Sequence, residues 1–291
     1  MQGLIKSFSD TLKITHASYI HGMKNSPLIW ITGASSGIGE ALTYAYAKRG
    51  ARLVISARRE NELQRVKKAC EGIPDNVFVL PIDLEQYAKA GEWYATVKSS
   101  MGVPDILINN GGIGHLGNAL DMDLAVEKKV MDINFWGSVA ITKSVLPDMV
   151  NRGSGKIVAV SSLLGHYGTA KLAAYAASKH AVLGYFESLR EELLTTGVDV
   201  LLVSPGFVNT NVTLNSLTEN GQKLDRNSIA QEQGMNPNDF AQKLISAISS
   251  SKQYAYIGGK ELLAIPFKRS APKLFYKTYR WLAGRVNKDT D

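Results

Sequence analysis

Short apolar runs alternate with helix-like segments from residue 28 almost to the end of the chain, and this alternation restricts the fold more than any other feature. Runs that are apolar at nearly every position are typical of strands buried on both faces, and therefore of a parallel sheet. Helical segments between successive strands indicate an α/β fold. We therefore predict a doubly wound parallel sheet of about seven strands, with helices on both faces. The runs are LIWIT, RLVISA, NVFVLPID, DILINN, GKIVAVSS, DVLLVSPG and YAYIG.

The 291 residues contain no internal repeat, no low-complexity block and no clear linker before the last part of the chain. α/β folds of this length are often single domains. We expect one domain at residues 28–260. An N-terminal extension at 1–27 precedes it, and a basic, aromatic, helical C-terminal extension at 261–291 follows it.

Charge and targeting signals narrow the class of protein. The formal net charge is +7, but much of it lies in the tail, so we do not expect nucleic-acid binding. The first 26 residues lack the continuous apolar run of a signal peptide, and no run approaches the roughly 18 residues of a membrane span. The single cysteine, Cys70, cannot form an internal disulfide, which fits a reducing compartment, and we expect it to be half-buried in a helix. These features favour a cytoplasmic protein.

Two glycine-rich stretches compete for the role of a phosphate-binding loop. NNGGIGHLG, at 109–117, matches G-x-G-x-x-G, but NALDMDL follows it as a poor helix start, and Asp132 lies in a helical pattern instead of at a strand end. TGASSGIG, at 32–39, lies between the first strand and a well-formed helix. Backbone N–H groups at a helix N-terminus can bind a pyrophosphate, and glycines let the backbone come close. We therefore predict that residues 32–39 bind the phosphates and that the first match is accidental.

The end of the second strand bears on the choice between NAD(H) and NADP(H). An acidic residue there accepts hydrogen bonds from ribose hydroxyls in NAD enzymes, whereas arginine suits a 2′-phosphate. The sequence has Ala57, Arg58 and Arg59 and no carboxylate at the strand end, which favours NADP(H). The alternative is that the two arginines only begin a solvated helix.

The pattern Tyr-x-x-x-Lys, which puts both side chains on one helical face, occurs three times: Tyr44/Lys48, Tyr94/Lys98 and Tyr175/Lys179. Only the third pair has serines upstream at the end of a buried strand, where α/β sheets place their ligands. These serines are Ser161 and Ser162, the last residues of GKIVAVSS. We therefore select the third pair as the candidate for catalysis.

Taken together, these motifs resemble the short-chain dehydrogenase/reductase family over about residues 28–260. In this family the sheet is Rossmann-type, and Ser162 is the family serine because it stands thirteen residues before Tyr175. SARRENEL and the extended tail are similar to the branch of hydroxysteroid dehydrogenase type 1-like and dehydrogenase/reductase member 7-like proteins. The ordered matches are TGASSGIG, Asp83, NNGG in place of NNAG, Asn134, Ser162, Tyr175, Lys179 and SPGFVNT at 204–210.

The resemblance implies a catalytic set of Asn134, Ser162, Tyr175 and Lys179. Tyr175 would exchange a proton with the substrate oxygen, and Ser162 would donate a hydrogen bond to that oxygen. The Lys179 ammonium would stabilise the phenolate and, helped by the positive charge of the nicotinamide when oxidised, is suited to lower the pKa of Tyr175 by about 2–3 units. Asn134 would hold a water that links Lys179 to solvent.

The resemblance also implies the cofactor and substrate contacts. No cluster of cysteines and histidines supports a metal site. The expected substrate contacts are Ser162, Leu164, Tyr175 and Phe207. The expected cofactor contacts are Gly33, Ser35, Ser36, Gly37, Ile38, Gly39, Arg58, Arg59, Asp83, Leu84, Asn110, Gly111, Tyr175, Lys179, Pro205, Gly206, Val208 and Thr210.

Apolar residues around the expected site indicate the substrate class. In this family the segment after the proline-glycine motif covers the substrate; here it is the lid, residues 207–235. Ordinary loop roles are expected for His115, His166 and Tyr167, with a place at the substrate mouth as the alternative. Leu163, Leu164, Val208, Val212, Leu214 and Leu217 indicate a lipophilic ketone or secondary alcohol as the small-molecule partner.

We therefore expect an NADP(H)-dependent oxidoreductase that works in the reductive direction. The competing function is a catalytically silent NADP(H)-binding sensor. Dimers or tetramers are common in such families, so a homo-oligomer is expected. The basic and aromatic tail suits peripheral contact with an anionic membrane, and it suits equally a helix over the substrate mouth or at a dimer interface.

Overall fold

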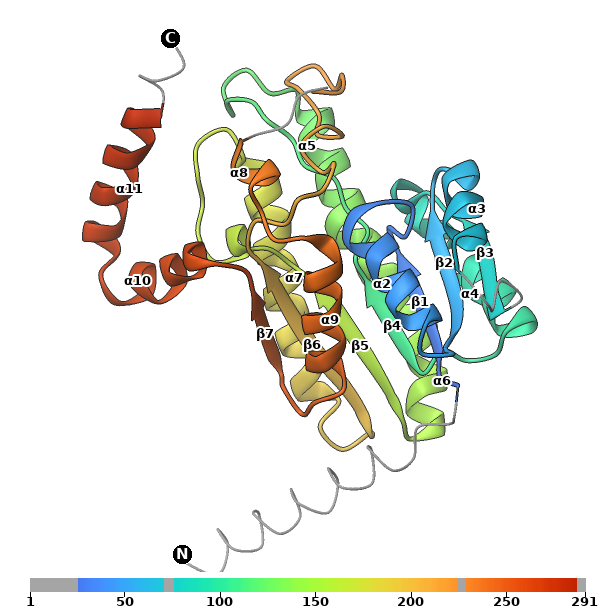
Figure 1. The fold of residues 1–291 in the computed structure, drawn as a ribbon. Helices are drawn as coiled ribbons and strands as arrows, with labels where there is room; N and C mark the ends of the chain where they lie inside the picture. The colour runs from blue at the N-terminus through green and yellow to red at the C-terminus, as the bar shows by residue number, and fades with distance from the viewer. Residues whose placement is uncertain (1–25, 71–75, 225–228, 287–291) are drawn as a thin grey trace, which may run out of the picture.

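Seven parallel strands form the centre of the molecule (Figure 1). The computed structural model describes residues 26–70, 76–224 and 229–286. Among them, the strands lie in the order β3-β2-β1-β4-β5-β6-β7, which confirms the predicted doubly wound parallel sheet. Their bounds are β1 Leu28–Thr32, β2 Arg52–Ala57, β3 Val77–Pro81, β4 Ile106–Asn109, β5 Gly155–Val160, β6 Val198–Pro205 and β7 Tyr254–Ile257.

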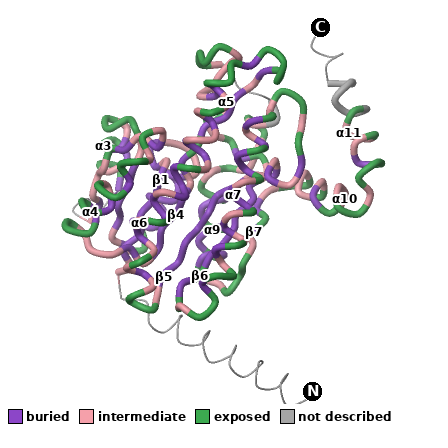
Figure 2. Tube along the Cα trace, turned by 180° about the vertical axis from the view of Figure 1, so that it is seen from behind, coloured by how far each residue is buried: buried purple, intermediate pink, exposed green. Residues whose placement is uncertain are grey.

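Helices cover both faces of the sheet, and alternate strand residues face the two helix layers. Ile29 and Ile31 of β1 pack with α2, α3 and α9, whereas Leu28 and Trp30 pack with α4, α6 and α7. Buried residues therefore follow the strands, and exposed residues lie on the outer helices (Figure 2). The helices are α2 Gly37–Ala47, α3 Glu60–Lys68, α4 Ala90–Ser100, α5 Leu124–Met131, α6 Gly137–Arg152, α7 Ala173–Glu192, α8 Ile229–Glu232, α9 Pro237–Ile248, α10 Ala264–Ser270 and α11 Pro272–Val286.

The carboxyl ends of β1 and β4 meet where the strand order reverses, and such a point is where open α/β sheets bind ligands. Thr32 Oγ1 accepts hydrogen bonds from the backbone N–H groups of Asn110 and Gly111, both at 3.0 Å. A Cβ atom on Gly33 would lie 2.8 Å from Gly111 Cα, and the φ of Gly33 is +68°. The close approach of these two loops therefore requires glycine at position 33.

The C-terminal extension forms two helices, α10 and α11, which project from the sheet beside the loop that follows β5 (Figure 1). Ile265 and Phe275 of the extension pack with Leu163 and Tyr167 of that loop in an apolar cluster of their own. No helix among the described residues is long and apolar enough to cross the hydrocarbon layer of a bilayer.

Cys70 is more deeply buried than the sequence predicts. Cys70 was expected to be half-buried in a helix, but it lies beyond the end of α3. It is buried because its side chain packs into the core with Leu63 and Val66.

The N-terminal extension at 1–27 lies almost wholly outside the described residues, so the domain boundaries stay predictions.

Candidate active site

The loop between β1 and α2 has the geometry of a phosphate-binding loop. Gly33 and Gly37 have positive φ angles of +68° and +58°, and a Cβ on Gly39 would lie 2.3 Å from the carbonyl oxygen of Gly33. Ser36 precedes α2 and makes no side-chain hydrogen bond to the first turn of that helix. The N–H groups of that turn are therefore not taken by a capping side chain, and they fit the pyrophosphate of a dinucleotide.

Arginines approach this loop from the end of β2. Arg59 Nη2 donates to Ser35 Oγ at 3.3 Å, while Arg58 is exposed. A third arginine, Arg65, which the sequence analysis missed, donates to the backbone oxygen of Ser35 at 3.4 Å. Arg65 lies on α3, whereas Arg58 precedes that helix, so the spacing of the two arginines along the sequence does not reveal the contact.

Arg65 differs from the other two arginines because carboxylates already neutralise it. Its guanidinium pairs with Glu40 at 2.7 Å and with Glu62 at 2.9 Å. These hydrogen bonds raise the pKa of Arg65 above its ordinary value. Within the described residues, Arg58 and Arg59 form no salt bridge, so they are the arginines at the end of β2 that remain available to an anionic ligand.

The neighbouring strand ends complete the crevice. Asp83 Oδ1 accepts from Glu85 N at 3.2 Å at the start of a 3₁₀ helix, Leu84–Lys89. Leu84 is buried, and a Cβ on Gly111 would lie 2.5 Å from its Cδ1 atom. Glycine in place of the usual alanine at 111 therefore accommodates the leucine side chain. Asn110 Nδ2 donates to Thr32 O at 3.0 Å and ties the β4 loop to the phosphate loop.

The stretch at 109–117 does not have the geometry of a phosphate loop. No helix follows it before α5 begins at Leu124, and Asp132 lies in a helical region, at the start of a π-helical stretch, Asp132–Trp136. The literal glycine match is therefore accidental, as predicted.

Ser162 and the pair on α7 come together at the carboxyl end of β5. Leu164 N donates to Ser162 Oγ at 3.1 Å, which leaves the Ser162 proton free to be donated to the Tyr175 phenol oxygen. Lys179 Nζ lies 5.7 Å from the centroid of the Tyr175 ring and donates to the backbone oxygen of Val160 at 3.0 Å. Ser161 instead bonds the backbone oxygen of Lys179 at 2.8 Å, so its hydroxyl is occupied in holding α7.

Asn134 joins the group from the π-helical stretch. Its Oδ1 accepts from Ile113 N at 2.7 Å, and its Nδ2 donates to Ile113 O at 2.9 Å and to Ser178 Oγ at 3.0 Å. A Cβ on Gly112 would lie 3.0 Å from Asn134 Oδ1 and 3.5 Å from Lys179 Nζ. Asn134 and Lys179 therefore face the same glycine, although both polar atoms of Asn134 already have protein partners.

Burial opposes the expected acidity of the tyrosine. It raises the pKa of Tyr175 above its ordinary value, and the hydrogen bond from Ser162 only partly offsets this rise. Burial also lowers the pKa of Lys179 to about 8. Among the protein groups, burial therefore has the largest influence on the pKa of Tyr175 and raises it, and the lowering expected from Lys179 together with the oxidised nicotinamide stays a prediction.

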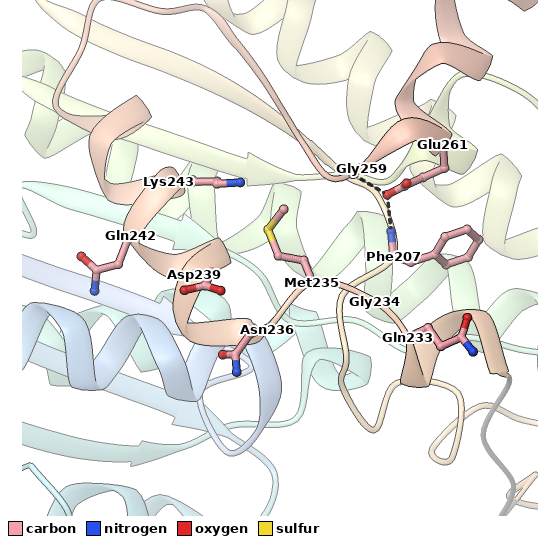
Figure 3. Close-up of a pocket in the computed structure, with 10 residues that line it drawn as sticks. All are labelled: Phe207, Gln233, Gly234, Met235, Asn236, Asp239, Gln242, Lys243, Gly259 and Glu261. Atoms are coloured by element: carbon pink, nitrogen blue, oxygen red, sulfur yellow. Dashed lines mark hydrogen bonds between the residues drawn. The ribbon is translucent and has the colours of Figure 1, made fainter.

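A cavity lies beyond the carboxyl end of β6. Phe207, which follows Pro205 and Gly206, lines a cavity of about 800 Å³ together with Met235 and Glu261 (Figure 3). Glu261 Oε1 accepts from Phe207 N at 3.1 Å and from Gly259 N at 2.9 Å. None of the four candidate catalytic residues lines this cavity, and the role of Phe207 as a substrate contact stays a prediction.

The other residues expected in the lid or at the substrate mouth lie in three different surroundings. Val208, expected to be an apolar point facing the substrate, is buried in the core, because its backbone pairs with Met235 beside β6. The side chain of Thr210 lies against Gly37 of the phosphate loop. Leu164 packs against the cluster formed with the C-terminal extension.

The two histidines and the tyrosine near the mouth have structural contacts. His166 Nε2 and Ser204 Oγ are 2.8 Å apart, and burial lowers the pKa of His166 to about 4. Tyr167 belongs to the cluster with the C-terminal extension. His115 Nε2 accepts a hydrogen bond from Tyr175 N at 3.1 Å.

No group of three or more metal-ligating side chains occurs in the part of the chain that the structure describes.

Comparison with known proteins gives consistent similarities. The family model of short chain dehydrogenases matches residues 27–221. The chain is 40% identical over 225 residues to a dehydrogenase/reductase SDR family protein 7-like of Drosophila melanogaster, covering 76% of this chain and 69% of that protein. It is 37% identical over 245 residues to dehydrogenase/reductase SDR family member 7 of Homo sapiens, covering 82% and 72%.

Solved structures show the same similarity. A short-chain dehydrogenase from Streptomyces avermitilis has a TM-score of 0.75 and 25% identity, covering 91% of this chain and 99% of that chain. The closed form of serine dehydrogenase complexed with NADP⁺ has a TM-score of 0.69 and 26% identity, covering 79% and 94%.

Proposed function

The chain belongs to the short-chain dehydrogenase/reductase family, in its member 7-like branch, and on that basis we propose that it is an NADP(H)-dependent oxidoreductase that reduces a lipophilic ketone to a secondary alcohol. The observation that carries this proposal is the meeting of the Ser162 hydroxyl, the Tyr175 phenol and the Lys179 ammonium at the end of β5. When bound, the reduced nicotinamide supplies a hydride.

The protein groups supply orientation and a proton. Ser162 donates a hydrogen bond to the substrate oxygen, and the Tyr175 phenol gives that oxygen its proton. Lys179, within 5.7 Å of the Tyr175 ring, stabilises the phenolate that remains. Asn134 holds the segment that covers Lys179 through its two bonds to Ile113.

The electrostatics support the reductive direction. Because burial raises the pKa of Tyr175, the phenol keeps its proton at neutral pH. A protonated phenol can act as an acid toward a carbonyl oxygen that gains negative charge, which is what reduction requires. Oxidation would need the phenolate, which the buried site disfavours.

The charge beside the phosphate loop supports NADP(H). Arg58 and Arg59 follow a strand that ends in Ala57, and no carboxylate stands there to bind ribose hydroxyls. Arg59 already contacts Ser35 of the loop. Serine dehydrogenase, one of the similar structures, is complexed with NADP⁺.

The apolar surroundings of Ser162 support a lipophilic substrate. Leu163 and Leu164 follow it directly, and aromatic residues of the C-terminal extension pack against them. A site bordered by such groups favours burial of an apolar ligand. Turnover of small polar sugars alone in a substrate screen would contradict this part of the proposal.

NADPH oxidation with a panel of ketones, repeated with NADH, tests the function. Tyr175→Phe should remove ketone-dependent oxidation while NADPH binding persists. Tyr44→Phe is the matched control, because Tyr44 also belongs to a Tyr-x-x-x-Lys pair but bonds Glu40 on α2. Binding of NADPH without any ketone-dependent rate in the wild-type protein would instead support the sensor.

We also propose a cytoplasmic homo-oligomer whose tail contacts anionic membranes. A single buried cysteine supports a reducing compartment. In the tail, Lys273, Lys277 and Arg280 are exposed, while Phe275 on the same helix is buried against the β5 loop. One helix can therefore both cover the loop and present positive charge outward.

A further inference from the structure

The segment at residues 112–117, part of the accidental glycine match, connects two parts of the proposed active site. Asn134 binds both the N–H and the carbonyl oxygen of Ile113, at 2.7 and 2.9 Å. Gly117 N donates to the backbone oxygen of Lys171 at 3.0 Å, four residues before Tyr175. The segment therefore runs from the proposed proton-handling residues to the start of the helix that carries the phenol.

The lid lies along the same segment. Leu217 N donates to Gly114 O at 3.0 Å, and Leu116 N donates to Leu217 O at 2.8 Å. These two bonds form a parallel bridge between His115 and Leu217. The lid residues around Leu217 are thus joined to the segment by main-chain hydrogen bonds on both sides of His115.

His115 lies at the centre of these connections. Its side chain is buried, with 1% of its surface exposed, and its Nε2 accepts from Tyr175 N at 3.1 Å. The helix α7 begins at Ala173, and the residue before it, Leu172, has no side-chain hydrogen bond to the first turn. Tyr175 is the third helical residue, and a capping side chain normally accepts from the N–H group of the second or third residue. His115 therefore caps the catalytic helix from another part of the chain.

The hydrogen bond fixes the protonation state of the ring. Because Nε2 accepts, the proton of the neutral imidazole is on Nδ1, and no described atom accepts a hydrogen bond from Nδ1. Burial lowers the pKa of His115, although the Glu219 carboxylate opposes this effect, so the ring stays neutral. The position of the imidazole ring therefore depends on the backbone of His115, and the bridge to Leu217 holds that backbone.

We propose that His115 is a positioning residue that transmits docking of the lid residues around Leu217 to the placement of Tyr175. The proposal rests on the proposed role of Tyr175 as proton donor. When the lid is docked, the bridge fixes the backbone of His115, and its imidazole fixes the first turn of α7. When the lid is displaced, this cap is weakened and the phenol loses its alignment with Ser162.

Substitutions at 115 test the cap. His115→Leu removes the acceptor, whereas His115→Gln places a carbonyl oxygen within reach of Tyr175 N. We expect His115→Leu to lower kcat by about tenfold, with the NADPH dissociation constant unchanged within twofold, and His115→Gln to recover most of the loss. Equal losses in both variants would overturn the proposal, because a purely space-filling role does not distinguish them.

Hydrogen exchange provides a readout that does not depend on turnover. In His115→Leu, exchange should accelerate at the Tyr175 amide and at the Leu217 amide together. Acceleration at Tyr175 alone would overturn the coupling to the lid. If the wild-type protein reduces no ketone, the proposed function fails, but the exchange result still decides whether the coupling exists.

A steric pair tests the coupling from the lid side. A Cβ on Gly114 would lie 2.4 Å from Ser216 Oγ but 3.5 Å from Ser216 Cβ, so Gly114→Ala should displace the lid and Ser216→Ala should relieve the clash. We expect Gly114→Ala to accelerate Tyr175 amide exchange and lower kcat by about tenfold. The double variant should return to within twofold of Ser216→Ala. No rescue in the double variant would overturn the proposal.

Discussion

At the scale of single residues, the site depends on a balance between burial and charge. Tyr175 retains its proton because burial raises its pKa. Burial lowers the pKa of Lys179 to about 8, which brings it close to neutral pH. Both shifts disfavour the charged form of each group. Near neutral pH, Tyr175 is therefore protonated and can donate its proton. The rate of ketone reduction should fall under alkaline conditions, because Lys179 then loses its charge.

Lys179 should produce an alkaline limb in the pH profile. Its folded pKa of about 8 lies below the ordinary value of 10.5, so it loses its proton as pH rises through about 8. The phenolate then loses a stabilising charge, and kcat/KM for the ketone should fall with a midpoint near pH 8. Lys179→Arg should abolish this limb at a lower overall rate, since a guanidinium stays charged. An unchanged limb in Lys179→Arg would assign it to another group.

Arg58 and Arg59 should determine the cofactor preference. Replacing both with serine should weaken NADPH binding about 10–100-fold, because hydrogen bonds to a charged phosphate are lost, and should leave NADH binding nearly unchanged. Lys67→Ser/Lys68→Ser is the matched control, because it removes the same charge from the far end of α3. Equal effects of the two double variants in cofactor titrations would mean that the arginines act only through net charge.

The sequence predicted that Ser162, Tyr175 and Lys179 lie near one another, which the structure shows, but it did not reveal that burial raises the pKa of Tyr175. The prediction followed from local order, because a serine at a strand end and a tyrosine on the next helix can be read along the chain. The pKa follows from desolvation, which depends on how completely the folded chain surrounds the phenol. The contact of Arg65 with Ser35 was missed for a similar reason, since it depends on how α3 packs against the loop.

At the scale of elements, the C-terminal extension supports the loop between Ser162 and Tyr175. Ile265 and Phe275 bury apolar surface against Leu163 and Tyr167, and Lys268 Nζ donates to the backbone oxygen of His166 at 3.1 Å. Tyr279 and Thr169 share a further hydroxyl–hydroxyl hydrogen bond. The two helices therefore hold the loop that connects Ser162 to α7.

Phe275→Ala should separate α11 from this loop. Loss of a buried phenylalanine costs about 3–5 kcal/mol of packing, which here is local to the extension. The KM for the ketone should rise about tenfold or more, while the NADPH dissociation constant stays unchanged. Leu274→Ala, the exposed neighbour on the same helix, should have no effect on either constant. Equal KM values for both variants and the wild type would show that the extension does not shape the site.

Elements with a strong apolar pattern were predicted well, and contacts between distant segments were not. All seven strands correspond to the runs identified in the sequence, because period and composition are local properties. The cap that His115 provides to Tyr175 joins residues 60 positions apart. The burial of Val208 depends on a bridge to Met235, which no short pattern encodes.

At the scale of the whole molecule, the C-terminal extension combines exposed basic residues with apolar residues that pack against the loop after β5. The formal net charge is +7, and the exposed basic residues of α11 contribute to it. Such a surface is attracted to anionic lipids and is screened by salt.

Cosedimentation with vesicles tests this attraction. The full chain should bind vesicles with about 30% phosphatidylserine at low salt and should be released at about 0.5 M salt. Charge reversal of Lys273, Lys277 and Arg280 to glutamate should abolish binding. Reversal of Lys48, Lys89 and Lys143, which are also exposed, changes the net charge equally and should retain it. Loss of binding in both triple variants would mean that attraction is not specific to the tail.

The π-helical stretch Asp132–Trp136 has a consequence for how this chain can change over time. A π-helical turn holds one residue more than an α-helical turn, so deleting one residue there would restore regular α-helical winding and leave α5 and α6 in nearly the same rotational phase. Ile141 and Val145 would keep their places in the core, whereas Asn134, inside the stretch, would lose its alignment with Ile113. A relative shortened by one residue here should therefore keep the packing of α5 and α6 and yet lack the hydrogen bonds by which Asn134 holds Ile113.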